Sequence, residues 1–216
     1  IEERYVAAVL QRVSRLAADL KSPERSTVLA ALDADEPHLR WALASSVDRQ
    51  DHHESLTVAT GLADYWLARR PSEGMAWLQR LLTGSDVTGV ERASVLLHMG
   101  HFAYWLTDFD HGIELLTEAR ELLADNADPL LLGRVLRRMG AIAAATDEID
   151  SARSLLAESA AVLDDGGDKA EAALSLLHLG SLLADESRTE EALPILIRAH
   201  EALRSAGDPL QEAHAL

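Results

Sequence analysis

The sequence contains no cysteine among its 216 residues. This absence excludes a disulfide scaffold and a thiolate metal site, and it suits a reducing compartment. The chain also lacks any apolar run of the roughly 18–20 residues that a membrane span needs, and no signal-peptide pattern opens it. We therefore expect a cytoplasmic protein that does not associate with a membrane.

Glycine and proline are scarce, at 12 and 6 residues, and runs of β-branched residues are few. The chain is instead rich in Ala, Leu, Glu and Arg, which favours helix nearly throughout. Its apolar content of 48% with 26% charged residues is typical of a globular protein and not of a disordered one.

Positive charge is in deficit. Twenty Lys and Arg residues stand against 36 Asp and Glu residues, which gives a formal net charge of −16. A polyanion cannot displace the counterions of DNA as a basic face does, so we expect no direct binding of nucleic acid by this chain.

Motifs of catalysis are missing as well. The sequence has no cysteine nucleophile, no G-x-S-x-G elbow and no H-E-x-x-H, and Gly166-Gly167-Asp168-Lys169 lacks the spacing of a phosphate-binding loop. His98 and His101 stand at i, i+3, with Asp108, Asp110 and His111 shortly after, a pattern that could suit zinc. We expect His98 to point off the concave face of its helix pair and His111 to lie beyond the turn, which separates these side chains. We therefore predict no enzyme activity, no cofactor and no metal site.

What the sequence does contain is a repeat with a step of forty residues. The pairs Met99-Gly100, Met139-Gly140 and Leu179-Gly180 keep this step, and so do Leu115-Leu116, Leu155-Leu156 and Ile195-Leu196. Self-similarity of this length indicates a helical solenoid, in which each unit buries its apolar face against its neighbours. The fold class predicted is all-α.

Each regular repeat is expected to hold two helices. The first runs over about 91–106, 132–146 and 170–185, and the second over about 110–124, 150–164 and 190–205. Asp128-Pro129 and Asp208-Pro209 fit the opening of a helix, because Asp is a good N-cap and proline suits the first helical position. Gly166-Gly167-Asp168 fits the opening of a helix without proline. Pro194 lies deeper in its helix, where we expect a kink or a lost hydrogen bond.

The first part of the chain is less regular. An amphipathic helix is predicted over Glu2–Leu20, followed by a short helix to about Leu32, another from Asp35-Glu36-Pro37 to about Val47, and one over Leu56–Arg69. We predict N-terminal helices over 1–50 that lead into an array over 51–216. Its repeats are expected at about 51–88, 89–128, 129–168 and 169–208, with a partial repeat from 209.

Two features predict that the chain is part of a longer protein. Its first residue is Ile1 and not Met, and residues 209–216 begin like another first helix. A solenoid needs polar capping elements at its ends, and the sequence offers none that we identify.

The repeats resemble those of the tetratricopeptide family. That family places an apolar residue, a Leu-Gly pair and then small and apolar residues at set offsets. The positions that fit are Leu136, Met139-Gly140, Ala152, Leu156 and Ser159, and again Leu176, Leu179-Gly180, Ala192, Leu196 and Ala199. The usual period is 34, and here the excess falls in a longer second helix. The resemblance implies a right-handed superhelical α-α solenoid.

The stretch from Leu32 to Leu43 is similar to the opening of the repeat domain in large bacterial signalling ATPases and LuxR-type transcriptional regulators. His38 stands where those proteins usually have Asn. This resemblance implies a sensor or interaction arm that works with other modules of the parent chain and binds a peptide, a protein or a small effector.

In the tetratricopeptide family the first helices line a concave groove. The family's offsets place seven candidate ligand-binding residues there: Tyr65, Trp66, His101, Tyr104, Trp105, Arg134 and Arg137. Seven of the nine aromatic residues lie between 65 and 109, and stacked aromatics are good anchors for a peptide or small molecule.

Alternatives remain for both groups of candidates. The aromatic residues can equally fill gaps between helices. The arginines can form a clamp for an acidic ligand, or pair with carboxylates on neighbouring helices. The whole array can also be a scaffold or oligomerisation arm without a ligand of its own, in which case we expect a homo-oligomer.

Overall fold

The structure is a computed structural model that describes residues 2–22, 24–49, 53–125 and 128–206. In these ranges the chain is helical and contains no strand. Two units divide it, residues 1–108 and 109–216, and the division falls between the two helices of the repeat predicted at 89–128. The partial repeat from 209, with Asp208-Pro209, lies outside the described residues.

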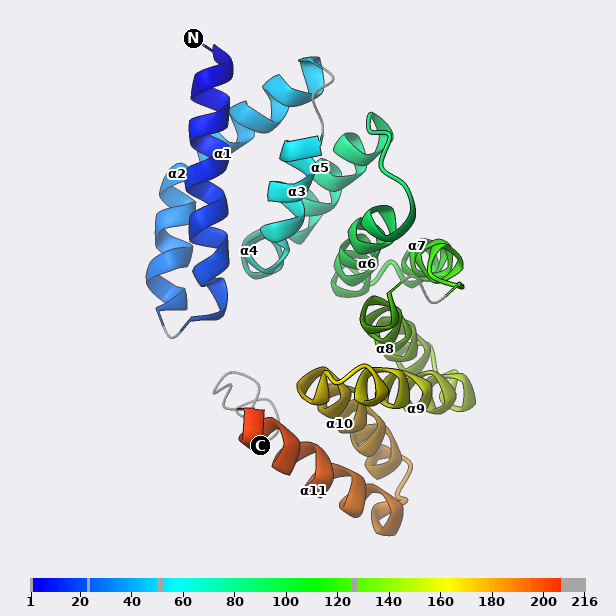
Figure 1. The fold of residues 1–216 in the computed structure, drawn as a ribbon. Helices are drawn as coiled ribbons and strands as arrows, with labels where there is room; N and C mark the ends of the chain where they lie inside the picture. Colours follow the sequence, from blue (N-terminus) through cyan, green and yellow to red (C-terminus); the bar gives the residue numbers. More distant parts are fainter. Residues whose placement is uncertain (1, 23, 50–52, 126–127, 207–216) are drawn as a thin grey trace. The chain divides into compact units, whose positions relative to one another are not determined.

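The first unit is built from six α-helices and one short 3₁₀-helix among its described residues. They are α1 (Glu2–Ala18), η1 (Asp19–Lys21), α2 (Arg25–Arg49), α3 (His53–Gly61), α4 (Ala63–Arg69), α5 (Pro71–Thr83) and α6 (Gly89–Trp105). Helix α1 packs against α2 and α3, while α5 packs against α3, α4 and α6 (Figure 1).

The second unit follows the predicted repeats closely. Its described helices are α7 (Phe109–Leu122), α8 (Pro129–Ala145), α9 (Ile149–Asp165), α10 (Lys169–Asp185) and α11 (Thr189–Ala206). Each of α7 to α10 packs against the next helix in the chain (Figure 1). The all-helical prediction and the forty-residue helix pairs are therefore confirmed.

Two boundaries in the first unit were predicted wrongly. The expected break before Pro37 does not exist, because α2 runs through it from Arg25 to Arg49. Proline removes one helical hydrogen bond at a cost of about 3 kcal/mol, but buried Leu32 and Leu39 on either side hold the helix in place. In contrast, the helix predicted over Leu56–Arg69 is interrupted at Leu62, directly after Gly61.

Small residues fix how the second unit packs. A Cβ atom placed on Gly140 would lie 2.8 Å from Leu156 Cγ, and one on Gly180 would lie 2.6 Å from Leu196 Cδ2. Both pairs join the first helix of a repeat to the second, sixteen residues along. The leucine thus rests directly on glycine backbone, which brings the two helix axes close together.

The turn inside each repeat is also repeated, and its conformation is not one that its residue types predict. Thr107, Asp147 and Ser187 all have positive φ, between 58° and 64°. At each of these turns the next residue's N–H donates to a carbonyl five residues back, such as Glu148 to Ala143 at 2.8 Å. This is the Schellman arrangement, which usually has glycine at the left-handed position.

Two of the predicted helix starts are confirmed in detail. The Asp128 carboxylate accepts a hydrogen bond from the Leu131 N–H at 2.9 Å, and Pro129 follows as the first helical residue. Asp168 does the same for the Glu171 N–H at 3.1 Å. Both are N-caps, which satisfy backbone donors that the helix itself leaves unpaired.

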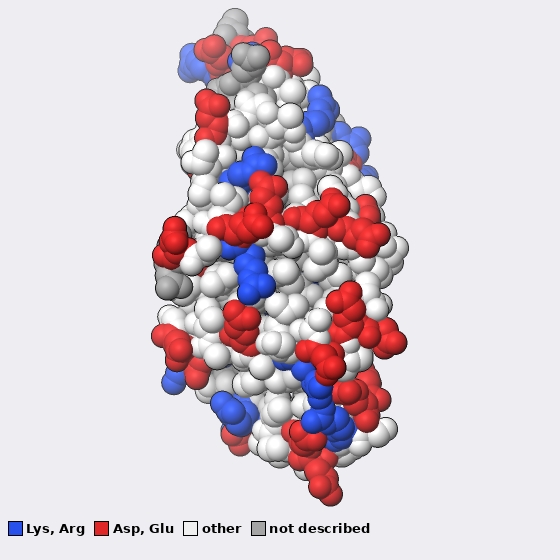
Figure 2. Space-filling model, turned by 90° about the vertical axis from the view of Figure 1, so that its right-hand side faces the viewer, with Lys and Arg blue, Asp and Glu red and all other residues white. Residues whose placement is uncertain are grey.

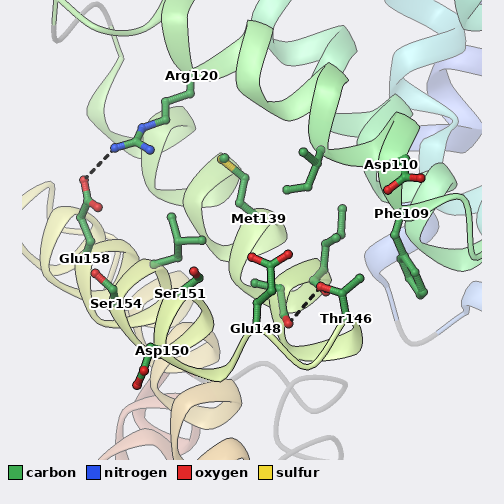
Figure 3. A pocket seen from close by; sticks show the side chains of 14 residues that line it. Phe109, Asp110, Arg120, Met139, Thr146, Glu148, Asp150, Ser151, Ser154 and Glu158 are labelled. Atoms are coloured by element: carbon green, nitrogen blue, oxygen red, sulfur yellow. Dashed lines mark hydrogen bonds and ion pairs between the residues drawn. The ribbon is translucent and has the colours of Figure 1, made fainter.

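The surface carries the acidic excess of the sequence. Figure 2 shows carboxylates spread across one face, with basic side chains between them. In the second unit a cleft of about 660 Å³ opens between α7 and α9, above α8 (Figure 3). A second cleft, of about 800 Å³, lies among α9, α10 and α11.

We predict that Gly140→Ala lowers the free energy of unfolding by about 1–2 kcal/mol, because the new methyl group must displace Leu156. Urea unfolding followed by circular dichroism measures the change. Gly61→Ala is the control, since no atom lies near its Cβ position, and it should cause no loss. If the contact is the cause, the double variant with Leu156→Ala will lose less than the sum of the two single variants.

Ser187→Gly should raise the free energy of unfolding by about 0.5 kcal/mol. The left-handed conformation costs a non-glycine residue about 1–2 kcal/mol, and the greater freedom of glycine in the unfolded chain cancels part of that gain. The same substitution inside α10, Ser181→Gly, should instead lower stability, because glycine is a poor helix former. Equal effects at the two serines in thermal unfolding would contradict this account of the turn.

Candidate functional site

Tyr65 and Trp66 are fully buried in the core of the first unit. Gly74 of α5 makes room for the Trp66 side chain, since a Cβ atom there would lie 2.5 Å from Trp66 Cβ and 2.7 Å from Cγ of the indole. Both rings therefore fill space between helices, as in the alternative interpretation of the aromatic residues. Burial, reinforced by the carboxylates of Asp33 and Glu36, raises the pKa of Tyr65 to about 12.

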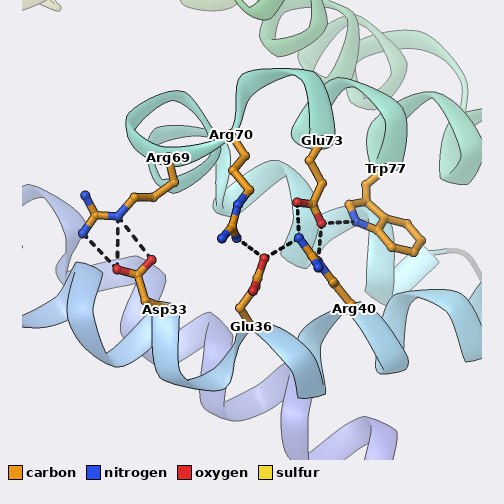
Figure 4. Close-up of polar contacts among 7 residues, drawn as sticks. All are labelled: Asp33, Glu36, Arg40, Arg69, Arg70, Glu73 and Trp77. Carbon is orange, nitrogen blue, oxygen red and sulfur yellow. Dashed lines mark hydrogen bonds and ion pairs between the residues drawn. The ribbon is translucent and has the colours of Figure 1, made fainter.

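A cluster of charged residues beside these rings joins α2 to α4 and α5 (Figure 4). Buried Glu36 binds the guanidinium groups of Arg40, at 2.6 Å, and of Arg70. Arg40 also makes two hydrogen bonds of 2.6 Å to Glu73. Charges of opposite sign thus alternate across the gap between helices.

The same cluster continues at both ends. Asp33 pairs with Arg69 at 3.0 Å, and the Trp77 indole N–H donates to Glu73 at 3.3 Å (Figure 4). Burial alone would raise the pKa of Glu73, but the hydrogen bonds from Arg40 and Trp77 outweigh it and lower the pKa. Sequence reasoning missed this cluster. Its signal is Glu36, an acidic residue on the apolar face that Leu32 and Leu39 define.

The end of α6 presents the other three aromatic and imidazole candidates together. The Trp105 side chain is 63% exposed, and its indole N–H donates to His101 Nε2 at 3.0 Å. The Tyr104 ring lies edge-on to the indole, with 6.0 Å between ring centroids. Trp105 is therefore a large apolar side chain that faces solvent yet is held in one orientation.

Arg134 and Arg137 lie together in the second unit and pair with acidic residues at the start of α10. Arg137 is 6% exposed and bonds to Glu171. Arg134 contacts Asp168 at 3.1 Å and Glu171 at 3.8 Å. Burial lowers the pKa of Arg137, and the nearby Glu171 opposes that effect. Both arginines thus pair with carboxylates of a neighbouring helix, which is the alternative interpretation of these residues.

A cluster of buried polar side chains lies near these arginines, and the sequence analysis did not identify it. Ser159 Oγ donates to the Gly133 carbonyl at 2.6 Å and contacts Ser175 Oγ at 2.8 Å. His178 is mostly buried close by on α10. Desolvation, together with the positive charges of Arg137 and Arg138, lowers the pKa of His178 to about 4. The imidazole is therefore neutral at physiological pH.

The seven predicted residues thus fall into three groups: the buried pair Tyr65 and Trp66, a group on α6 in which Trp105 is exposed and His101 and Tyr104 are half-buried, and the ion-paired Arg134 and Arg137 on α8. Within the described residues, no three His, Asp or Glu side chains lie close enough together to hold a metal ion. No described helix is both long and apolar enough to cross a bilayer.

Comparison with solved structures identifies this arrangement of helices. A variant of a protein from Podosopora anserina that is assigned as a kinesin light chain, with nearly identical TPR-like repeats, superposes with a TM-score of 0.69. The two chains share 13% identity, over 92% of this chain and 96% of that one. The fold is tetratricopeptide-like.

Other tetratricopeptide-like structures agree. BtubC (BKLC) from P. vanneervenii gives a TM-score of 0.64 with 17% identity, over 97% of this chain and 93% of its own. YrrB, a TPR protein with an unusual peptide-binding site, gives 0.53 with 18% identity, over 88% of each chain. No family model matches the sequence, and no curated protein matches it. At these identities the likeness establishes the fold alone.

We predict a pH dependence of stability from His178. Its folded-state pKa of about 4 lies below the ordinary value of 6.5, so the unfolded chain binds the proton first. Stability is therefore fully present above pH 6.5 and falls as the pH is lowered toward 4, by roughly 1 kcal/mol per pH unit in the middle of that range. Urea midpoints measured between about pH 7 and pH 5 test this.

His178→Gln removes the titrating group, so the variant should show a much shallower slope over the same range. An unchanged slope in the variant would rule out His178 as its source.

Proposed function

We propose that this chain is an interaction domain that binds a peptide or a segment of another protein through a surface at the end of α6. Trp105 carries this proposal. An indole that is 63% exposed and fixed by His101 and Tyr104 is a pre-formed anchor. Binding then costs little side-chain entropy, and tryptophan is enriched among residues that dominate interface energies.

We assign direct contact with the ligand to His101, Tyr104 and Trp105. Arg134 and Arg137 receive a supporting role, since their ion pairs with Asp168 and Glu171 join the first helices of successive repeats. Their guanidinium groups pair with these carboxylates, so they stabilise the packing of α8 against α10 within the second unit. The description of YrrB as a TPR protein with a peptide-binding site supports a peptide as the ligand class.

The finer part of the proposal concerns the parent protein. The resemblance of the stretch from Leu32 to Leu43 supports a cytoplasmic bacterial regulator, either a signalling ATPase or a LuxR-type transcriptional regulator. In that setting, binding at the α6 surface would bias the state of a switch module elsewhere in the parent chain. Expression of the full-length gene product, with the switch module's nucleotide hydrolysis measured with and without the bound peptide, tests this part.

The binding site itself is tested with peptides selected from a displayed random library on the whole chain. We predict that Trp105→Ala weakens the selected peptides by about 2 kcal/mol or more, which is roughly thirtyfold. Trp41→Ala is the matched control, because Trp41 is also an exposed tryptophan of the first unit, at 42%. Isothermal titration calorimetry gives both values. Equal losses in the two variants would contradict a specific site at α6.

A second candidate function uses the same residue. If the array is an oligomerisation arm, Trp105 is its self-association surface. Sedimentation equilibrium separates the two: a concentration-dependent dimer that Trp105→Ala abolishes supports the arm, whereas a monomer that still binds the selected peptides supports the interaction domain.

A further inference from the structure

The cleft between α7 and α9 is a surface that the proposed function does not use. Its walls come from the second helices of two successive repeats, and its floor comes from Met139, Ile142 and Ala143 of α8. At about 660 Å³ it lies within the size range of ligand sites in proteins, roughly 300–1,000 Å³. The cleft is therefore large enough to take bulky side chains of a partner.

The floor of the cleft is apolar, and its rim is mostly acidic. Partly buried Ile113 and Leu155 continue the floor up the two walls. Asp110, Glu148 and Glu158 lie around the opening, and Arg120 supplies the opposing charge there (Figure 3). An apolar floor beneath a predominantly acidic rim selects a partner that carries apolar and positively charged groups side by side.

The second cleft of this unit shows that the charge pattern is not a general result of the fold. It lies among α9, α10 and α11, and its charged residues have both signs: Asp164, Asp165 and Glu201 with Lys169 and Arg198. One repeat step of forty residues takes Glu158 of the acidic cleft to Arg198 of the mixed one. The charge at the equivalent position is thus reversed.

We propose that the cleft between α7 and α9 binds a basic peptide segment, in which a bulky apolar side chain enters the cleft and flanking Lys or Arg residues meet Glu148 and Glu158. A second copy of this chain fits poorly, because its net charge is −16 and two acidic surfaces repel each other. Charge complementarity therefore favours a basic partner.

The positive charge of Arg120 repels the basic groups of such a ligand. Its guanidinium lies 3.9 Å from Glu158 Oε1, and both side chains are about half exposed. At that distance and exposure the pair is weak, so a lysine of the ligand can replace Arg120 beside the carboxylate. Removing Arg120 should consequently strengthen binding, an effect that a merely structural role would not produce.

The test uses a panel of short fluorescein-labelled peptides with a central Leu, Phe or Trp flanked by lysines, and a second panel with glutamates in place of the lysines. Fluorescence anisotropy with the full chain should detect binding from the lysine panel alone. Glu148→Gln combined with Glu158→Gln should weaken it about tenfold, and Arg120→Gln should tighten it about threefold. Circular dichroism confirms that each variant is folded.

The matched control is Glu121→Gln combined with Glu190→Gln, which removes the same charge from exposed positions outside the cleft. It should change the affinity less than about twofold, and Trp105→Ala should not change it. The proposal is overturned if no lysine peptide binds, if the glutamate panel binds equally, or if the control weakens binding as much. Loss of binding in Trp105→Ala would also overturn it.

Discussion

The regular part of this structure depends on one contact, in which a leucine of a repeat's second helix rests on a glycine of its first. Gly140 receives Leu156, and Gly180 receives Leu196, at separations that leave no room for a methyl group. The first unit uses the same device with a larger partner, since Gly74 receives Trp66. Dispersion between a side chain and bare backbone is short-ranged, so this close approach is what turns neighbouring helices into a packed pair.

Ion pairs then connect one helix pair to the next. In the second unit Arg134 and Arg137 of α8 reach Asp168 and Glu171, thirty-four residues later, at the start of α10. The first unit contains the same kind of link, from Arg40 of α2 to Glu73 of α5. These pairs add to the cost of moving one helix along another, because a displaced carboxylate or guanidinium would lose its partner in a poorly hydrated place.

The sequence predicted what depends on local patterns. Helix ranges in the second unit came from the forty-residue repeat, and two of their starts came from Asp128 and Asp168, because N-capping involves residues three positions apart. The repeat step located Gly140 and Gly180. Each of these signals involves residues of one helix or of one repeat, so the sequence order alone is enough to find them.

What the sequence could not predict depends on distant residues. Local rules end a helix before Pro37, but burial of the flanking leucines against other helices decides otherwise. Tyr65-Trp66 and Tyr104-Trp105 look equivalent in sequence, yet the first pair is covered by the packing of Gly74 against Trp66, while Trp105 is exposed. The left-handed turns at Asp147 and Ser187 carry no glycine, so no residue type marked them.

These observations separate what the fold requires from what it leaves free. The contact of glycine with leucine and the aspartate cap at the first helix recur in the repeats at 129–168 and 169–208. Trp105 recurs in neither of the next two repeats, where Ala145 and Asp185 occupy the equivalent positions. Glu158 is likewise replaced by Arg198. Side chains that differ between repeats while the backbone stays the same contribute little to the packing, so they are where a repeat protein can acquire a specific ligand without changing its architecture.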